Sequence, residues 1–172
     1  MLITNQQKLI STHFFYWFLL WTLLLQFIVW QIETTPSMAN FIEHGLAQIS
    51  GQLYNFYSQQ WLVTDNKIIH SDSLRFVYVD RSCTGLSLIA TLTAAFFSLS
   101  FSWSKKITMV IIAALLIQIE NLIRITHLFH LVKQVDNDFD FYHLYIWQLT
   151  NFIVALLIFY ALIWIYNKNN KH

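Results

Sequence analysis

Long apolar stretches recur along this chain, and polar connections of different length separate them. The stretches cover residues 14–30, 86–103, 107–132 and 144–166. A helix needs roughly 20 apolar residues to cross the hydrocarbon core of a membrane. The pattern therefore predicts four transmembrane helices, although Gln26 interrupts the first stretch and a polar cluster around Glu120 and Arg124 interrupts the third.

The long connection between the first two stretches, residues 33–82, has patterns of its own. Apolar residues recur at helical spacing in residues 37–57 and predict an amphipathic helix, buried against neighbouring protein or at the membrane interface. Short β-prone runs follow on both sides of Asp65 and Asn66 and in residues 74–79, which predicts a β-hairpin or a three-stranded meander. The expected fold is an all-α integral membrane helix bundle, one membrane domain over residues 1–172, with this amphipathic helix and hairpin outside the membrane.

Composition supports a membrane protein and excludes several other classes. Apolar residues make up 56% of the chain and charged residues only 11%, unlike a soluble domain. A formal net charge of +1, with no basic patch outside the short ends, gives no support for nucleic-acid binding.

Lysines indicate the orientation in the membrane, because cytoplasmic connections collect Lys and Arg. They precede the first span, fill the turn between the second and third spans and follow the fourth: Lys8, Lys105, Lys106, Lys168 and Lys171. We therefore expect both termini in the cytoplasm and residues 33–82 on the other side of the membrane. A cleaved signal peptide ending near Ser37-Met38-Ala39 is an alternative, but the apolar run is long and favours an uncleaved anchor.

The single cysteine, Cys83, lies where the second span is predicted to begin. Helix dipole and Arg81 would favour its thiolate there, and Gly85 allows the close backbone approach that an oxyanion-binding turn requires. The alternative is an ordinary small buried residue. One cysteine excludes an internal disulfide bond.

Arg124 is a second candidate, because a cation about 12 Å below the outer end of a span costs several kcal/mol unless it is paired or hydrated. Glu120 is its expected partner, and His127 shares its helix face. His143 begins the fourth span at the outer side, where an interfacial histidine among aromatic residues is the alternative. Topology brings Cys83, Arg124 and His143 to one membrane face, which suits a nucleophile, an oxyanion-stabilising cation and a proton-transfer group.

These residues resemble the exosortase and archaeosortase family of membrane cysteine transpeptidases, over residues 74–166. The resemblance rests on Cys83-Thr84-Gly85, on the segment Asn121-Leu122-Ile123-Arg124-Ile125, and on His143; it is greatest to the exosortase H type. The family pattern implies catalytic roles for Cys83, Arg124 and His143, with His127 as an alternative acid/base and Thr84, Gly85, Glu120 and Asn121 in support.

The resemblance also implies a substrate and a reaction. The substrate is a secreted protein with a C-terminal sorting signal that includes a transmembrane helix; cleavage forms a thioester, and an acceptor (water, lipid or a glycan amine) resolves it. Neither a metal nor a cofactor is expected.

Two other classes of function stay open on the sequence alone. His13, His127, His130 and His143 could ligate haem or a metal within a helix bundle. A non-catalytic membrane assembly subunit, with polar residues joining its helices, is the other.

Overall fold

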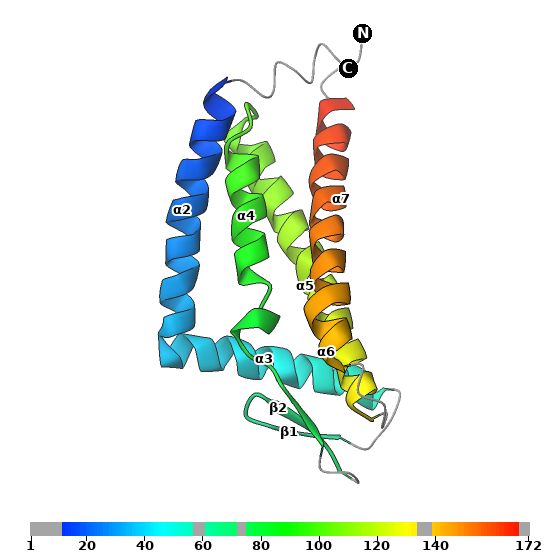
Figure 1. Ribbon diagram of the computed structural model, residues 1–172. Helices are drawn as coiled ribbons and strands as arrows, with labels where there is room; N and C mark the ends of the chain where they lie inside the picture. The colour runs from blue at the N-terminus through cyan, green and yellow to red at the C-terminus, as the bar shows by residue number, and fades with distance from the viewer. Residues whose placement is uncertain (1–11, 57–60, 72–74, 134–138, 169–172) are drawn as a thin grey trace. The chain divides into compact units, whose positions relative to one another are not determined.

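A computed structural model describes residues 12–56, 61–71, 75–133 and 139–168 (Figure 1). The chain divides into two compact units. The helical unit comprises Met1–Gln31, Leu86–Ile117 and Ala155–His172, and the hairpin unit comprises Ile32–Gly85 and Gln118–Val154.

Four apolar helices contribute to the helical unit: α2 (Thr12–Thr34), α4 (Leu86–Phe97), α5 (Trp103–Lys133) and α7 (Trp147–Lys168). Three segments are long and apolar enough to span a membrane, namely His13–Thr34, Trp103–Val132 and Phe139–Lys168. Many of their large apolar side chains are exposed, as expected for helices that face lipid rather than water.

The second predicted span, residues 86–103, is shorter in the structure than the sequence predicts. Its helix, α4, has 12 residues and is about 18 Å long, which is shorter than the hydrocarbon core. Four spans are therefore not confirmed. After Phe97, the Ser98 N–H and hydroxyl both donate to the Ala94 carbonyl oxygen, at 3.1 and 2.7 Å, and a non-helical segment then leads to α5. Lys105 and Lys106, expected in a turn, lie in the first turn of α5.

Helix α3 (Pro36–Asn55) of the hairpin unit confirms the predicted helix, with proline in its first turn. Its burial differs from the expected one. The side that is buried carries Glu43, Ala47, Ser50, Gly51 and Tyr54. The predicted apolar face is largely exposed, including Met38, Ile49, Leu53 and Phe56. The small residues Ala47 and Gly51 allow close approach of the sheet, which explains why this side of α3 is buried.

The predicted hairpin is confirmed as a three-stranded antiparallel meander in the order β1 (Trp61–Thr64), β2 (Lys67–His70) and β3 (Phe76–Tyr78). Thr64 pairs with Lys67 across a two-residue turn in which Asp65 has a φ of 55°. Asp and Asn tolerate this left-handed conformation, which matches the strand twist.

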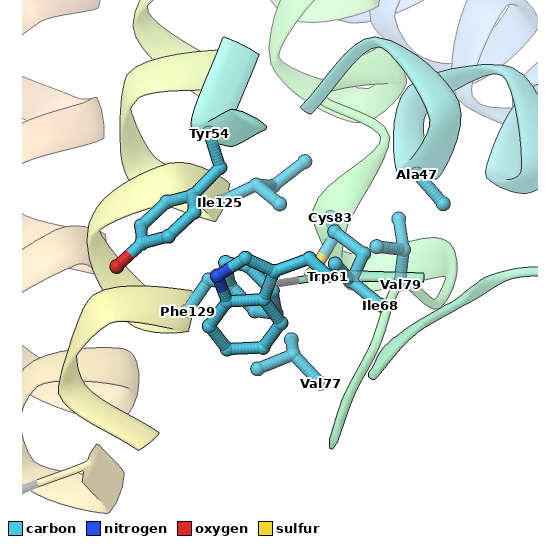
Figure 2. Close-up of a cluster of buried hydrophobic side chains, with 9 residues drawn as sticks. All are labelled: Ala47, Tyr54, Trp61, Ile68, Val77, Val79, Cys83, Ile125 and Phe129. Carbon is cyan, nitrogen blue, oxygen red and sulfur yellow. The ribbon is translucent and has the colours of Figure 1, made fainter. Parts of the chain in front are cut away.

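One face of the sheet forms the core of the hairpin unit (Figure 2). Its members come from α3, the three strands, the residue after β3, the turn η1 (Arg81–Cys83) and α5: Ala47, Tyr54, Trp61, Ile68, Val77, Val79, Cys83, Ile125 and Phe129. Cys83 is thus fixed by the same cluster that holds the sheet.

The last segment begins with α6 (Phe139–Phe141) and the π-helix η2 (Tyr142–Ile146) and continues into α7. His143 lies in the π-helix, a wider turn often found at functional sites.

Candidate functional site

Cys83 is the last residue of η1, a 3-10 turn capped by Asp80. The Asp80 carboxylate accepts hydrogen bonds from the Ser82 backbone N–H at 2.9 Å and the Ser82 hydroxyl at 2.6 Å. Gly85, two residues on, has a φ of 70°, which only glycine adopts at little cost, and α4 starts at the next residue. The turn therefore fixes the backbone conformation at Cys83, shortly after β3 in the chain.

The thiol is more buried than the sequence led us to expect, with 4% of Cys83 exposed. Burial raises the pKa of the thiol, and this outweighs the lowering caused by the Arg124 charge and the Ser82 hydroxyl. The expectation that a helix dipole and Arg81 would favour the thiolate is therefore wrong. The cation that acts on the thiol is Arg124.

Two amide side chains of α5 hold the backbone on either side of the thiol. Asn121 donates from Nδ2 to the carbonyl oxygen of Cys83 at 2.5 Å, and Gln118 donates from Nε2 to that of Thr84 at 3.0 Å. Thr84 donates its hydroxyl to the Arg81 carbonyl oxygen at 2.9 Å and contacts Glu33 at 3.4 Å. Asn121 and Thr84, both expected as supporting residues, thus fix the position of the turn.

Arg124 is 5% exposed and makes an unusual set of contacts for a buried cation. Its Nη2 lies 3.5 Å from Nδ1 of His143, and Nη1 lies 3.1 Å from the Asn151 side-chain oxygen when the amide is oriented to match its neighbours. Its Nε is buried and has no hydrogen-bond partner among the described residues. One donor of the guanidinium is therefore available.

The expected pairing of Glu120 with Arg124 passes through an amide. In the same orientation, the Asn151 amide nitrogen donates to both carboxylate oxygens of Glu120, at 2.6 and 3.2 Å, while its oxygen accepts from Arg124. Asn151 follows Gln148 and Thr150 near the start of α7, and the sequence analysis missed it. Its position four residues after Trp147, on one face of α7, was the available signal.

The two candidate histidines have different surroundings. His143 contacts Arg124 and stacks on Phe139, with ring centroids 5.6 Å apart. His127 accepts from the Trp147 indole N–H at 3.2 Å and lies edge-on to Tyr142. Contact with Arg124, which acts on the thiol, favours His143.

Backbone donors beside the thiol are already used. The N–H of Cys83 donates to Asp80 O at 2.9 Å, and that of Thr84 to Arg81 O at 3.2 Å. These two groups cannot stabilise an oxyanion without opening the turn. The Arg124 Nε described above is, by contrast, a buried donor without a partner among the described residues.

The histidine-ligand alternative gains no support from the arrangement. Among residues 12–56, 61–71, 75–133 and 139–168, no three His, Cys, Asp or Glu side chains gather as a metal site requires. His130 lies 3.3 Å from the Tyr54 hydroxyl, and His13 belongs to the helical unit.

Comparison with known proteins adds one finding. The family model of the transmembrane exosortases (Exosortase_EpsH) matches residues 10–164. No curated protein and no solved structure matches the chain.

Proposed function

Because this chain belongs to the transmembrane exosortase family, a family of membrane cysteine peptidases and transpeptidases, we propose that it cleaves the C-terminal sorting signal of secreted proteins and transfers them to an acceptor. The observation that carries the proposal is the position of Arg124. One guanidinium acts on the Cys83 thiol, contacts His143 and keeps a free buried donor.

The first step requires the thiol to lose its proton, because the thiolate is the nucleophile. Burial keeps Cys83 protonated at neutral pH, so a base must take the proton as the substrate arrives. His143 is the proposed base. The Cys83 sulfur then attacks the scissile carbonyl carbon, and the proton on His143 passes to the leaving amine as the C–N bond breaks.

The product of this step is a thioester between Cys83 and the secreted protein. An acceptor nucleophile gives its proton to His143 as it attacks the thioester carbon, and His143 passes that proton to the Cys83 sulfur as the C–S bond breaks. Arg124 stabilises the oxyanion of both tetrahedral intermediates through its available Nε–H, a kind of contact that contributes about 3–4 kcal/mol in other acyl-transfer enzymes.

Glu120 and Asn151 keep Arg124 in place during this cycle. A buried guanidinium with a flexible stem loses catalytic value if it can turn away, and the Asn151 amide fixes one end of it.

The proposed topology places the reaction on the extracytoplasmic face of a bacterial inner membrane, with both termini in the cytoplasm. Lysine distribution supports this orientation, and a fourth crossing requires α4 together with the residues that flank it. The substrate's own membrane helix and the surrounding lipid are the expected partners.

The test compares host cells that produce the wild-type protein with cells that produce Cys83→Ala. Mass spectrometry of protein C-termini identifies secreted proteins whose membrane segment is removed only by the wild type. Hydroxylamine added to wild-type membranes should release the same proteins as hydroxamates, because it attacks thioesters.

Cys83→Ser is the matched control for folding, because it preserves the size and shape of the side chain. Equal amounts of both variants in the membrane, with processing lost in both, support the proposal. Processing that persists in both variants would overturn it.

A further inference from the structure

The strand that leads to Cys83 is an edge strand. In the pairing of β2 with β3, His70 N donates to Arg75 O at 2.8 Å, and Val79 N donates to Asn66 O at 2.9 Å. Antiparallel pairs alternate between hydrogen-bonded and non-hydrogen-bonded positions. Arg75, Val77 and Val79 therefore turn their backbone groups toward β2, whereas Phe76 and Tyr78 turn theirs to the outer edge.

No described residue takes up these outer groups: Phe76 and Tyr78 form no hydrogen bond outside the ladder in the part of the chain that the structure describes. Their side chains are half exposed, at 53% and 50%, on the face opposite the core. An open edge of this kind is a template for another extended chain.

The edge is tied to the nucleophile by a rigid connection. Val79, next to Tyr78, is fully buried in the cluster that also contains Cys83. Asp80 follows and caps the turn that ends in Cys83. A chain paired with β3 is therefore held in register with the thiol.

From these observations we propose that the substrate docks as an added strand on the free edge of β3, with its backbone bonded to Phe76 and Tyr78. The inference rests on the proposed function and states how that site recognises its substrate. The rise of two extended residues and a 3-10 turn places the thiol about 12 Å from Tyr78 at most. The scissile bond then lies about three or four residues beyond the paired segment.

Recognition by backbone groups would leave specificity to pockets beside the strand. One such cavity, of about 510 Å³, adjoins Tyr78 and is lined mainly by polar side chains: Ser37, Asn40, Phe41, His44, Asp65, Asn66 and Tyr78. His44 is fixed there by the Asp65 carbonyl oxygen at 2.6 Å. A polar side chain of the docked segment fits this lining.

Proline scanning tests the edge directly. Tyr78→Pro removes only an N–H that points away from β2, and proline is tolerated at such edge positions. We expect at least a tenfold loss in the rate of substrate processing. Tyr78→Thr also removes the aromatic ring but keeps the N–H and a β-prone side chain, so it should lose clearly less rate than Tyr78→Pro, and the difference between the two measures the backbone contact.

Two readouts separate this inference from the proposed function. Tyr78→Pro should react with iodoacetamide at Cys83 at the wild-type rate, showing a folded site, and its residual cleavage should still disappear with Cys83→Ala. The probe for docking is the secreted protein that accumulates uncleaved with Cys83→Ala; a photoreactive residue at Phe76 should cross-link to it near its cleavage site.

Wild-type processing by Tyr78→Pro would overturn strand addition and leave the cysteine chemistry intact. A cross-link from position 76 to a second copy of this chain, or to lipid alone, would also overturn it. If Tyr78→Pro loses both alkylation and processing, the proline has damaged the site, and Phe76→Pro is tested in its place. Phe76→Pro removes the other outward N–H and carries the same expectation.

Discussion

The two units each bury a cation, and the surroundings of the two cations differ. Lys106 in the helical unit donates to the Phe97 carbonyl oxygen at 2.7 Å and lies over the Trp103 ring. Arg124 in the hairpin unit contacts two polar side chains and keeps an unpartnered donor. A buried charge is expensive in either place, so burial alone does not identify a site. What distinguishes Arg124 is that one of its partners is a histidine, which can move protons, and that its Nε has no partner among the described residues.

The largest effect should come from replacing the guanidinium of Arg124 with an ammonium group of the kind that Lys106 carries. Arg124→Lys keeps the charge but loses the planar group that contacts His143 and Asn151 together. We expect processing to fall by about 100-fold or more, the loss seen when one oxyanion donor is removed. The measurement is the initial rate of sorting-signal removal in isolated membranes.

Lys106→Arg is the matched control, because it keeps a buried cation and a donor for Phe97. It should process substrate within about twofold of the wild type, because substitutions at sites that share no contacts act almost independently. Equal losses of processing rate in Arg124→Lys and Lys106→Arg would contradict the conclusion that only the buried cation of the hairpin unit acts in the reaction.

The second prediction compares two amide side chains, each of which forms hydrogen bonds between two helices. Asn151 joins Glu120 to Arg124, whereas Gln26 of α2 donates to the Ser87 carbonyl oxygen at 2.9 Å and to the Thr91 hydroxyl at 3.1 Å. Asn151→Leu should slow processing about tenfold, because it frees the guanidinium and leaves a carboxylate without donors. Gln26→Leu should alter thermal stability in detergent but not the processing rate.

A double substitution separates positioning from general damage. Glu120→Gln added to Asn151→Leu removes the uncompensated carboxylate, so the double variant should lose less than the sum of the two single losses. Strictly additive losses would show that Asn151 does not act through this contact.

Some of this contrast was predictable and some was not. The helix at residues 37–57 and the meander follow from local period and turn residues, which depend on near neighbours. The exposed apolar face of α3 does not, because the sheet selected the side with Ala47 and Gly51 for close packing. The short α4 was not predicted either, because apolar residues continue past Phe97, whereas the helix ends at that residue.

The candidate site shows the same division. Topology brought Cys83, Arg124 and His143 to one face of the membrane, and the structure gathers the three in the hairpin unit. The protonation of Cys83 was predicted with the wrong sign, because local sequence shows Arg81 and a helix start but not the cluster that buries the sulfur. Asn151 was missed because its only signal in the sequence was a place on the same helix face as Trp147.

The third prediction concerns the pH dependence of Cys83. Its pKa is raised, so the thiol is neutral at neutral pH and alkylation by iodoacetamide should keep accelerating with pH beyond the point where an ordinary cysteine reaches its plateau. Arg124→Gln removes the charge that lowers this pKa, so its alkylation should be slower at each pH. The unfolded thiol ionises first as pH rises, so stability should decrease above the unfolded-state pKa.

Alkylation rates between neutral and alkaline pH, followed by mass spectrometry of intact protein, provide the measurement. A plateau at the pH of a free cysteine would show that burial does not control the thiol, and Arg124 would lose its assigned effect on it.

The smallest expected effect lies within the hairpin unit and asks how firmly packing sets the position of the site. Two glycines of α3 differ in their surroundings: a Cβ at Gly51 would meet Val63 Cγ2 of β1 at 2.5 Å, whereas one at Gly45 would meet nothing within 4 Å. Gly45→Ala should raise stability by up to about 1 kcal/mol through helix propensity. Gly51→Ala should lower it by about 1–3 kcal/mol, because the β-branched Val63 cannot easily turn away. Thermal unfolding in detergent measures both.

Since β1 pairs with β2 and β2 with the strand that leads to Cys83, Gly51→Ala should also slow processing a few-fold while Gly45→Ala does not. Unchanged processing in a destabilised Gly51→Ala would mean that the turn around Cys83 is held by Asn121 and Gln118 of α5 alone, independently of the sheet.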